Sequence, residues 1–147
     1  MVEALGQAKS TVLVQPYSFT SAPIAKALVE AHKRRVNLQV VLDRSQRTEK
    51  YLSATFVYNH DIPCFIDGQH AIAHNKVMVV DAQTVITGSF NFTEVAEENN
   101  AENLLVIQDA DMAAKYAQNW KARREHSEPY TGLAAAEERA RPRSRKR

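Results

Sequence analysis

Apolar residues in this chain recur with two different periods, and the alternation between these periods predicts an α/β domain. The runs TVLVQPY and NLQVVLD have strand length and few polar residues. Between them, Ala25, Leu28 and Val29 recur at helical spacing. A strand, a helix and a second strand of these lengths predict a right-handed parallel crossover. By the same criteria, strands are predicted at 11–17, 37–43, 62–67, 73–80, 84–89 and 101–109, and helices at 1–9, 23–34, 48–59, 92–98 and 110–125.

The strands 73–80 and 84–89 are separated only by a short polar turn, so we expect them to be antiparallel. The chain therefore predicts a mixed β-sheet with helices packed on its faces, in one domain over residues 1–125. With 147 residues, such a domain can bury an adequate core without a metal or a disulfide. The single cysteine, Cys64, is expected to be a small buried apolar residue.

The net charge of +2 is unevenly distributed along the chain. Residues 1–120 carry a net charge of −3, and residues 121–147 carry +5. The last nine residues, RARPRSRKR, contain six basic side chains and no acidic one. We predict that residues 126–147 form a basic, unfolded arm, which either attracts polyanions or is merely solvated. No segment has the composition of a signal peptide or the length of a membrane span, so we expect a soluble domain without an export signal, in an undetermined compartment.

The stretch HNKVMVVDAQTVITGSFNF carries an unusual set of polar residues between two apolar strands. His74 and Lys76 are two residues apart, and so are Ser89 and Asn91. Side chains two apart on a strand project from the same face, so each pair should converge on one place. A cation, an imidazole, a hydroxyl and an amide, with no acid among them, suit a bound phosphate group.

Gly88 and Asp81 in this stretch have structural interpretations, and two other kinds of active site are disfavoured. Gly88 would let a backbone and a ligand approach closely, or it marks a simple kink. Asp81 stands at the turn and is interpreted as a turn or ion-pair residue. A serine hydrolase is disfavoured because TGSFN lacks the G-x-S-x-G elbow. His70 and His74 would share a metal only on a helix, where we expect loop and strand, so no metal site is predicted.

The same residues carry a family resemblance. Their spacing, H-x-K-x4-D-x6-G-S-x-N, resembles the signature of the phospholipase D superfamily, with His74, Lys76, Asp81, Gly88, Ser89 and Asn91 at the specified positions. The flanking segments, from about residue 2 to residue 125, are similar to the small bacterial endonucleases of that superfamily, which carry one motif per chain. The resemblance implies a phospholipase D-like fold.

The resemblance also implies a metal-independent phosphodiesterase that needs no cofactor. His74 would attack phosphorus to form a phosphohistidine, and a second motif histidine would protonate the leaving oxygen and later activate water. Lys76 and Asn91, with Ser89, would stabilise the phosphoryl oxygens. Glu102 occupies the place of the acidic residue that orients the nucleophilic ring in these endonucleases, and the alternative is a surface charge at the end of a strand.

Because the mechanism needs two histidines and the chain has one motif, a homodimer with a shared active site is predicted. Two adjacent imidazoles should titrate in two steps, which predicts a bell-shaped pH profile.

The substrate is less constrained than the chemistry. The resemblance favours non-specific cleavage of DNA. RNA, phospholipase D-type hydrolysis of phospholipid head groups, and non-catalytic nucleic-acid binding remain alternatives. A lipid substrate would suit an apolar lip, which Phe90 and Phe92 could form unless they belong to the core.

The chain departs from the small endonucleases in two respects. They begin with a signal peptide, which suggests a periplasmic or exported protein, and with a strand ahead of the first helix. Here the chain starts inside that helix, so either it is truncated or another element covers that edge of the sheet, and exposed edge pairing is a hazard. Arg35 stands where the relatives typically have glycine, and a left-handed backbone there would cost roughly 1 kcal/mol.

Overall fold

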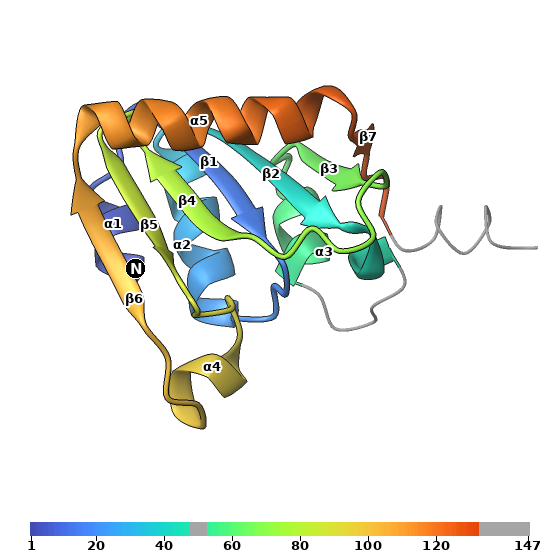
Figure 1. Cartoon of the computed structure of the whole chain (residues 1–147), viewed down its shortest axis with the longest axis horizontal. Helices are drawn as coiled ribbons and strands as arrows, with labels where there is room; N and C mark the ends of the chain where they lie inside the picture. The colour runs from blue at the N-terminus through green and yellow to red at the C-terminus, as the bar shows by residue number, and fades with distance from the viewer. Residues whose placement is uncertain (48–52, 133–147) are drawn as a thin grey trace, which may run out of the picture.

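The computed structural model describes residues 1–47 and 53–132, which form a β-sheet with helices against both faces (Figure 1). The strands are β1 (Thr11–Pro16), β2 (Asn37–Asp43), β3 (Cys64–Asp67), β4 (Lys76–Val80), β5 (Thr84–Gly88), β6 (Leu104–Gln108) and β7 (Glu128–Pro129). The helices are α1 (Val2–Gly6), α2 (Ala22–Lys33), the 3-10 helix η1 (Arg44–Arg47), α3 (Ser53–Tyr58), α4 (Glu94–Glu98) and α5 (Ala110–Glu125). None of the helices in these two ranges combines the length and the apolar character that crossing a membrane requires.

The sheet is mixed, as the sequence predicts. Its strand order is β6-β5-β4-β1-β2-β3-β7. The pairs β1–β2 and β2–β3 are parallel, and the remaining pairs are antiparallel. The predicted crossover from β1 through α2 to β2 and the predicted hairpin of β4 and β5 are both confirmed. The predicted helix 48–59 begins in residues that lie outside the described ranges, and α3 is its described part.

Local signals set both ends of α2. The Ser21 hydroxyl accepts a hydrogen bond from the backbone N–H of Ile24 at 3.4 Å, which caps the first turn. After the helix, Arg35 has a φ of 69°. The Arg35 N–H donates to the carbonyl oxygen of His32 at 2.9 Å, and the Val36 N–H donates to the carbonyl oxygen of Ala31 at 3.2 Å. These two hydrogen bonds form a Schellman motif at the end of the helix. The left-handed backbone anticipated at Arg35 is therefore present, with a cost of roughly 1 kcal/mol for a residue that is not glycine.

The core consists of two apolar layers, one on each face of the sheet. The larger layer lies between the sheet and α1, α2 and α3, and the smaller layer lies under α5, which crosses the opposite face from the β6 side to the β7 side (Figure 1). Trp120 fastens α5 to the sheet because its indole N–H donates to the carbonyl of Val14 at 3.0 Å. Cys64 is buried in the larger layer, as predicted, and burial raises the pKa of its thiol to about 12.

The packed part of the chain continues past the boundary that was predicted after residue 125. β7 pairs with β3, and Tyr130 is buried with 4% of its surface exposed. The Tyr130 hydroxyl lies 3.0 Å from the Thr55 hydroxyl on α3. The boundary therefore lies later than predicted, because contacts between residues far apart in the sequence hold this polar segment against the rest of the domain. Residues 133–147, which hold the basic run, lie outside the described residues.

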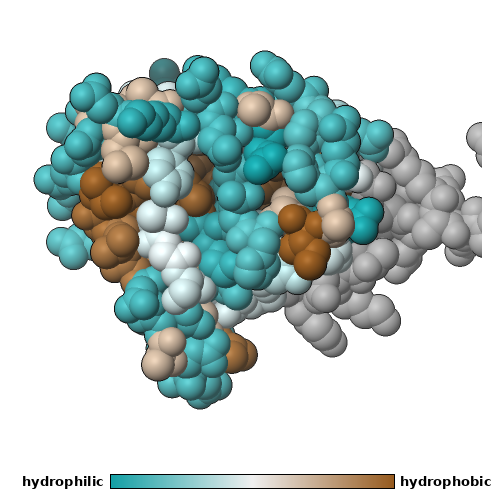
Figure 2. Space-filling view, in the orientation of Figure 1, coloured by the Kyte–Doolittle hydropathy of each residue, from teal (hydrophilic) through white to brown (hydrophobic). Residues whose placement is uncertain are grey.

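β6 forms one edge of the sheet and exposes apolar side chains. Leu104, Leu105 and Val106 are 38%, 55% and 51% exposed. Figure 2 shows hydrophobic colour gathered over this strand. An edge strand with exposed apolar side chains can pair with another chain.

Candidate active site

The register of the sheet brings the motif residues to one edge. The carboxyl ends of the parallel strands β1, β2 and β3 share this edge, and antiparallel β4 begins there, because Pro16 pairs with Lys76. Met78 of β4 pairs with Ile86 of β5. Because these strands are antiparallel, Lys76, two residues before Met78, lies opposite Gly88, two residues after Ile86. Gly88 in turn pairs with Leu104 at the start of β6. Segments from distant parts of the chain therefore meet at the edge where α/β sheets usually bind ligands.

His74 lies in the loop of residues 68–75, just before β4. The prediction that it belongs to the strand is wrong, and it meets Lys76 by a different route. The Lys76 ammonium nitrogen lies 3.3 Å and 3.2 Å from the two ring nitrogens of His74, and 3.2 Å from the His74 carbonyl oxygen. The imidazole is exposed, so the pair faces solvent at the sheet edge.

Tyr17 is a site residue that the sequence analysis missed. Its ring packs edge-on against the His74 ring, with centroids 4.5 Å apart. The Lys76 ammonium lies 5.4 Å from the centre of the Tyr17 ring, within the range of a cation–π contact. The available signal was its place directly after β1, at the carboxyl edge of the sheet.

Two buried carboxylates anchor the loop that carries His74. Asp43 and Asp67 are register partners at the ends of β2 and β3, and they are 2% and 0% exposed. Asp43 accepts a hydrogen bond from the backbone N–H of Ala73 at 2.7 Å, one residue before His74. Asp67 accepts from the N–H of Gln69 at 3.0 Å. The backbone is thus fixed at both ends of the loop, and His74 stands on a restrained segment.

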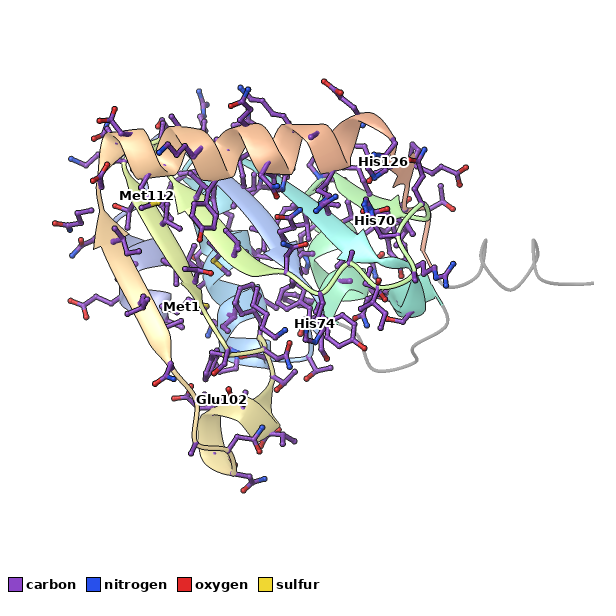
Figure 3. All side chains as sticks on the ribbon, in the orientation of Figure 1. Met1, His70, His74, Glu102, Met112 and His126 are labelled. Atoms are coloured by element: carbon purple, nitrogen blue, oxygen red, sulfur yellow. The ribbon has the colours of Figure 1, made fainter. Side chains whose placement is uncertain are left out.

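Ser89 and Glu102 bind each other, on the side of the site formed by β5 and β6. The Ser89 hydroxyl donates to one carboxylate oxygen of Glu102 and accepts from the N–H of Asn103 at 3.0 Å. The other carboxylate oxygen accepts from the Asn100 amide at 3.2 Å. Figure 3 labels Glu102 and His74 on the same side of the sheet. Within residues 1–47 and 53–132, however, no hydrogen bond joins them, so the orienting role predicted for Glu102 is not seen in one chain.

Glu102 does act on Lys76 through its charge. Burial lowers the pKa of Lys76, and the negative charge of Glu102 opposes that decrease. A carboxylate near a partly desolvated ammonium favours the charged form. Glu102 therefore helps to keep a cation at the site.

Asn91 is held by its neighbour Phe92. Phe92 forms a parallel bridge with Phe19, and its N–H donates to the Ser18 carbonyl at 3.2 Å. The Asn91 side-chain oxygen is buried and has no hydrogen-bond partner in the described part of the chain. Phe92 is 1% exposed, and Phe90 packs partly buried against the core. Phe92 is therefore a core residue, and the two rings do not form the apolar lip that a lipid substrate would suit. A buried amide atom without a partner is unusual and indicates a site that is completed by something else.

Gly88 answers a steric demand from the neighbouring strand. Its φ is 149°, and a Cβ atom there would lie 2.1 Å from the carbonyl oxygen of Asn103. The close approach anticipated at Gly88 is therefore an approach to the backbone beside β6. Any larger residue would displace the segment that carries Glu102.

Asp81 lies at the opposite end of β4, in the turn before β5. Its carboxylate accepts hydrogen bonds from the backbone N–H groups of Lys9, Ser10 and Thr11, at 2.7–3.1 Å. Burial raises the pKa of Asp81, but these hydrogen bonds more than compensate and hold it below its ordinary value. Asp81 fixes the entry into β1 and makes no contact with the phosphate-binding set.

His70 does not join His74. Its Nδ1 atom lies 2.8 Å from the Asp67 carboxylate, whereas His74 contacts Tyr17 and Lys76. The metal pair that the sequence analysis disfavoured is thus not formed.

The candidate active site around His74 contains an imidazole, an ammonium, an amide and a hydroxyl–carboxylate pair, which together can bind and attack a phosphate ester.

Comparisons with known proteins agree with this geometry. Residues 1–124 match the family model described as "Cardiolipin synthase, PLD-like domain". The chain belongs to this phospholipase D-like family. It is 38% identical over 124 residues to a protein of Rickettsia bellii named phospholipase D, which covers 84% of this chain and 62% of the relative. The chain thus spans about three fifths of the length of that relative.

Two solved structures share the fold. Nuc from Salmonella typhimurium, a phospholipase D family member, has a TM-score of 0.85 and 36% identity, over 89% of this chain and 88% of that one. NucT from Helicobacter pylori has a TM-score of 0.80, over 88% and 87% of the two chains, and at 22% identity it supports the fold alone. The phospholipase D-like fold implied by the sequence is confirmed.

Proposed function

We propose that this protein is a metal-independent phosphodiesterase in which His74 is the nucleophile. The observation that carries the proposal is the exposed imidazole of His74 beside the Lys76 ammonium, 3.2 Å away, on a loop fixed by buried carboxylates. An exposed ring can reach a large ester, and the adjacent cation attracts its phosphate.

The reaction has two displacements at phosphorus. In the first, a ring nitrogen of His74 forms a bond to phosphorus, the ester P–O bond breaks, and a second histidine gives its proton to the leaving oxygen. In the second, water attacks phosphorus and loses a proton to that second histidine, and the N–P bond breaks. The nucleophilic ring is neutral at the start and the second ring is protonated, so atoms and charge balance over the cycle.

The second histidine is provided by a second copy of the chain. The sequence contains one H-x-K motif, and a twofold dimer would bring His74 of each protomer to one pocket. The exposure of His74 supports this arrangement, because its ring is left open toward the outside of the protomer.

The remaining residues stabilise charge in the transition state. Lys76 and the Asn91 amide nitrogen would contact nonbridging phosphoryl oxygens, and the Ser89 hydroxyl, which donates to Glu102 in the free protein, would have to redirect its proton to add a third donor. Glu102 holds Ser89 and keeps Lys76 charged, which is a positioning role distinct from the ring-orienting role expected from the resemblance.

For the substrate, we favour DNA cleaved with little sequence preference. The support is the likeness to Nuc over nearly the full length of both chains. A phospholipid is the second candidate, because the Rickettsia relative is named phospholipase D and the family model is described as cardiolipin synthase.

A substrate panel in excess chelator tests the reaction class and the substrate together. Single-stranded DNA, duplex DNA, RNA and phosphatidylcholine vesicles would be incubated with the wild type, with His74→Ala and with His32→Ala, a control on α2 remote from the sheet edge. We expect nicking of DNA by the wild type and the control, and loss with His74→Ala. Consumption of the lipid alone would move the assignment to phospholipase D, and activity that survives His74→Ala would refute the proposal.

A mixing experiment tests the shared pocket. Wild-type and His74→Ala chains would be unfolded, mixed in equal amounts and refolded together. If each pocket needs both histidines, only wild-type homodimers are active. Activity should then fall to about a quarter of that shown by wild type alone at the same total chain concentration. Independent pockets would give about half.

A further inference from the structure

A second cluster of titratable side chains lies at the end of the 68–75 loop remote from His74. Asp67 ends β3, His70 lies in the loop, and His126 caps the carboxyl end of α5. Nδ1 of His70 and Nε2 of His126 lie 2.8 Å and 3.1 Å from the two carboxylate oxygens of Asp67. Figure 3 shows His70 and His126 next to each other, away from His74.

The contact between His126 and Asp67 has the distance of a hydrogen bond without its direction. Nε2 of His126 is buried and has no hydrogen-bond partner in the described part of the chain, although an Asp67 oxygen lies 3.1 Å away. Two ligands of one metal ion stand in this relation: they lie about 3 Å apart and point at the ion instead of at each other. One ligand atom from each of Asp67, His70 and His126 lies within 4.8 Å of the others.

We propose that Asp67, His70 and His126 form a binding site for a divalent transition-metal ion, and that Zn²⁺ fits it best. Two imidazoles and one carboxylate are a ligand set that zinc uses, with a water molecule in the fourth position. The site is separate from the His74 pocket, and the inference does not depend on the proposed reaction.

The electrostatics of the cluster suit a cation. Asp67 is fully buried, and the rings of His70 and His126 lie 2.8 Å and 3.1 Å from its carboxylate oxygens. A metal ion would compensate the charge of this buried carboxylate.

Arg123 sets the strength of the site. Its Nη1 atom lies 2.8 Å from Nε2 of His70, so without metal Nε2 accepts from Arg123 and Nδ1 donates to Asp67. A metal at Nδ1 displaces that proton, Nε2 takes up a proton from water, and the guanidinium must withdraw. Arg123 is half-buried, so it can move toward solvent, but the lost hydrogen bond weakens metal binding. We therefore expect affinity in the micromolar range, below that of a permanent structural zinc site.

A bound ion would tie α5 to the loop that leads to His74. Asp67 and His70 flank the start of this loop, and His126 belongs to the far end of α5. The ion would therefore stabilise the fold and the loop without touching substrate, and activity in excess chelator would persist.

Zinc binding by the full chain, stripped with chelator and free of any affinity tag, tests the proposal. Equilibrium dialysis should give one Zn²⁺ per chain for the wild type and for His32→Asn, and binding at least about tenfold weaker for His126→Asn. His74→Ala should bind like the wild type. Equal binding by His126→Asn and the wild type, or no zinc bound at micromolar concentrations, would overturn the site, as would loss of binding only in His74→Ala.

Thermal unfolding provides the second readout. Zn²⁺ at ten times the wild-type dissociation constant should raise the Tm of the wild type by roughly 4 °C, and that of His126→Asn by about 1 °C or less. His126→Asn is preferred to a substitution of Asp67, whose carboxylate also holds the loop backbone and whose loss could prevent folding. A Tm that rises equally in both proteins would show that zinc binds elsewhere.

Discussion

The two ends of the 68–75 loop satisfy their polar atoms in different ways. At one end, Asp67 is fully buried and accepts three hydrogen bonds, from Gln69 and from the backbone and ring of His70. At the other end, His74 is exposed and meets only Lys76 and Tyr17 among the described residues. Asp67 holds the backbone in place at one end, and at the other end the exposed ring of His74 is available to a substrate.

The same contrast separates Asp81 from Asn91. Asp81 is surrounded by backbone donors, whereas the Asn91 oxygen is buried without a partner. We therefore expect Asp81 to contribute to stability, and Asn91, whose amide nitrogen is the donor proposed for the phosphate, to contribute to catalysis.

The largest effect is expected from Asn91→Ala. Removal of one preorganised donor to a phosphoryl oxygen should lower kcat by about 10²–10³-fold. Stability should be unchanged or slightly higher, because an unsatisfied buried polar atom is removed. Steady-state kinetics and denaturant unfolding measure the two quantities, with the exposed Asn119→Ala as control. A loss of stability with normal kcat would reverse the assignment of this residue.

Substitution of Asp43, which holds the loop next to His74, is expected to lower both stability and kcat. Asp43→Ala leaves the buried N–H of Ala73 without its acceptor and should cost about 1–3 kcal/mol in the free energy of unfolding. It should also lower kcat by roughly tenfold, because the nucleophile is less well positioned.

Asp43→Asn is the matched control, since its amide oxygen can still accept from Ala73. It should recover most of the lost kcat. Equal defects in both variants would show that the charge of Asp43 or its hydrogen bond from the Ser45 N–H, and not its hydrogen bond to the loop, is what matters.

Asp81→Ala should act on stability in a pH-dependent way. The folded state lowers the pKa of this carboxyl, so its contribution is present above the unfolded value of about 3.9 and is lost as the pH falls through the lower folded value. We expect a deficit of about 2 kcal/mol at pH 7 that shrinks below about pH 4. Urea unfolding of both proteins from pH 3 to pH 7 measures it, and a deficit that is constant with pH would contradict the account.

The smallest effect is expected from Glu102→Gln on the pH profile. The Glu102 charge opposes the lowering of the Lys76 pKa by burial, so its removal should let that pKa fall further. Lys76 would then lose its charge at lower pH, and the alkaline limb of the kcat/KM profile should move to lower pH. A shift toward higher pH would exclude this role for Glu102.

Two elements were predicted with the bounds that the structure shows. They are the strand 37–43, an apolar run that is buried from Val40 to Asp43, and the helix 110–125. The position of His74 was misjudged because Ala73 is apolar and buried, which extends the strand pattern, although a hydrogen bond to Asp43 and not a strand holds it.

Contacts between residues far apart in the chain could not be predicted from periodicity. β7 and the approach of His126 to Asp67 depend on where α5 ends above the sheet. The partner of Glu102 is another example, because a spacing motif identifies a residue without its hydrogen bonds. Tyr17 differs in that its position at the end of β1 was visible, and only the sheet register shows what it faces.

The most direct test of the account is to trap the covalent intermediate. The full chain would be mixed rapidly with a short DNA duplex in excess chelator and quenched in alkaline denaturant, because an N–P bond to imidazole is labile in acid. Mass spectrometry of the digested protein should then find a phosphoryl adduct on His74. Turnover without an adduct, or an adduct on Ser89 in place of His74, would contradict the central claim.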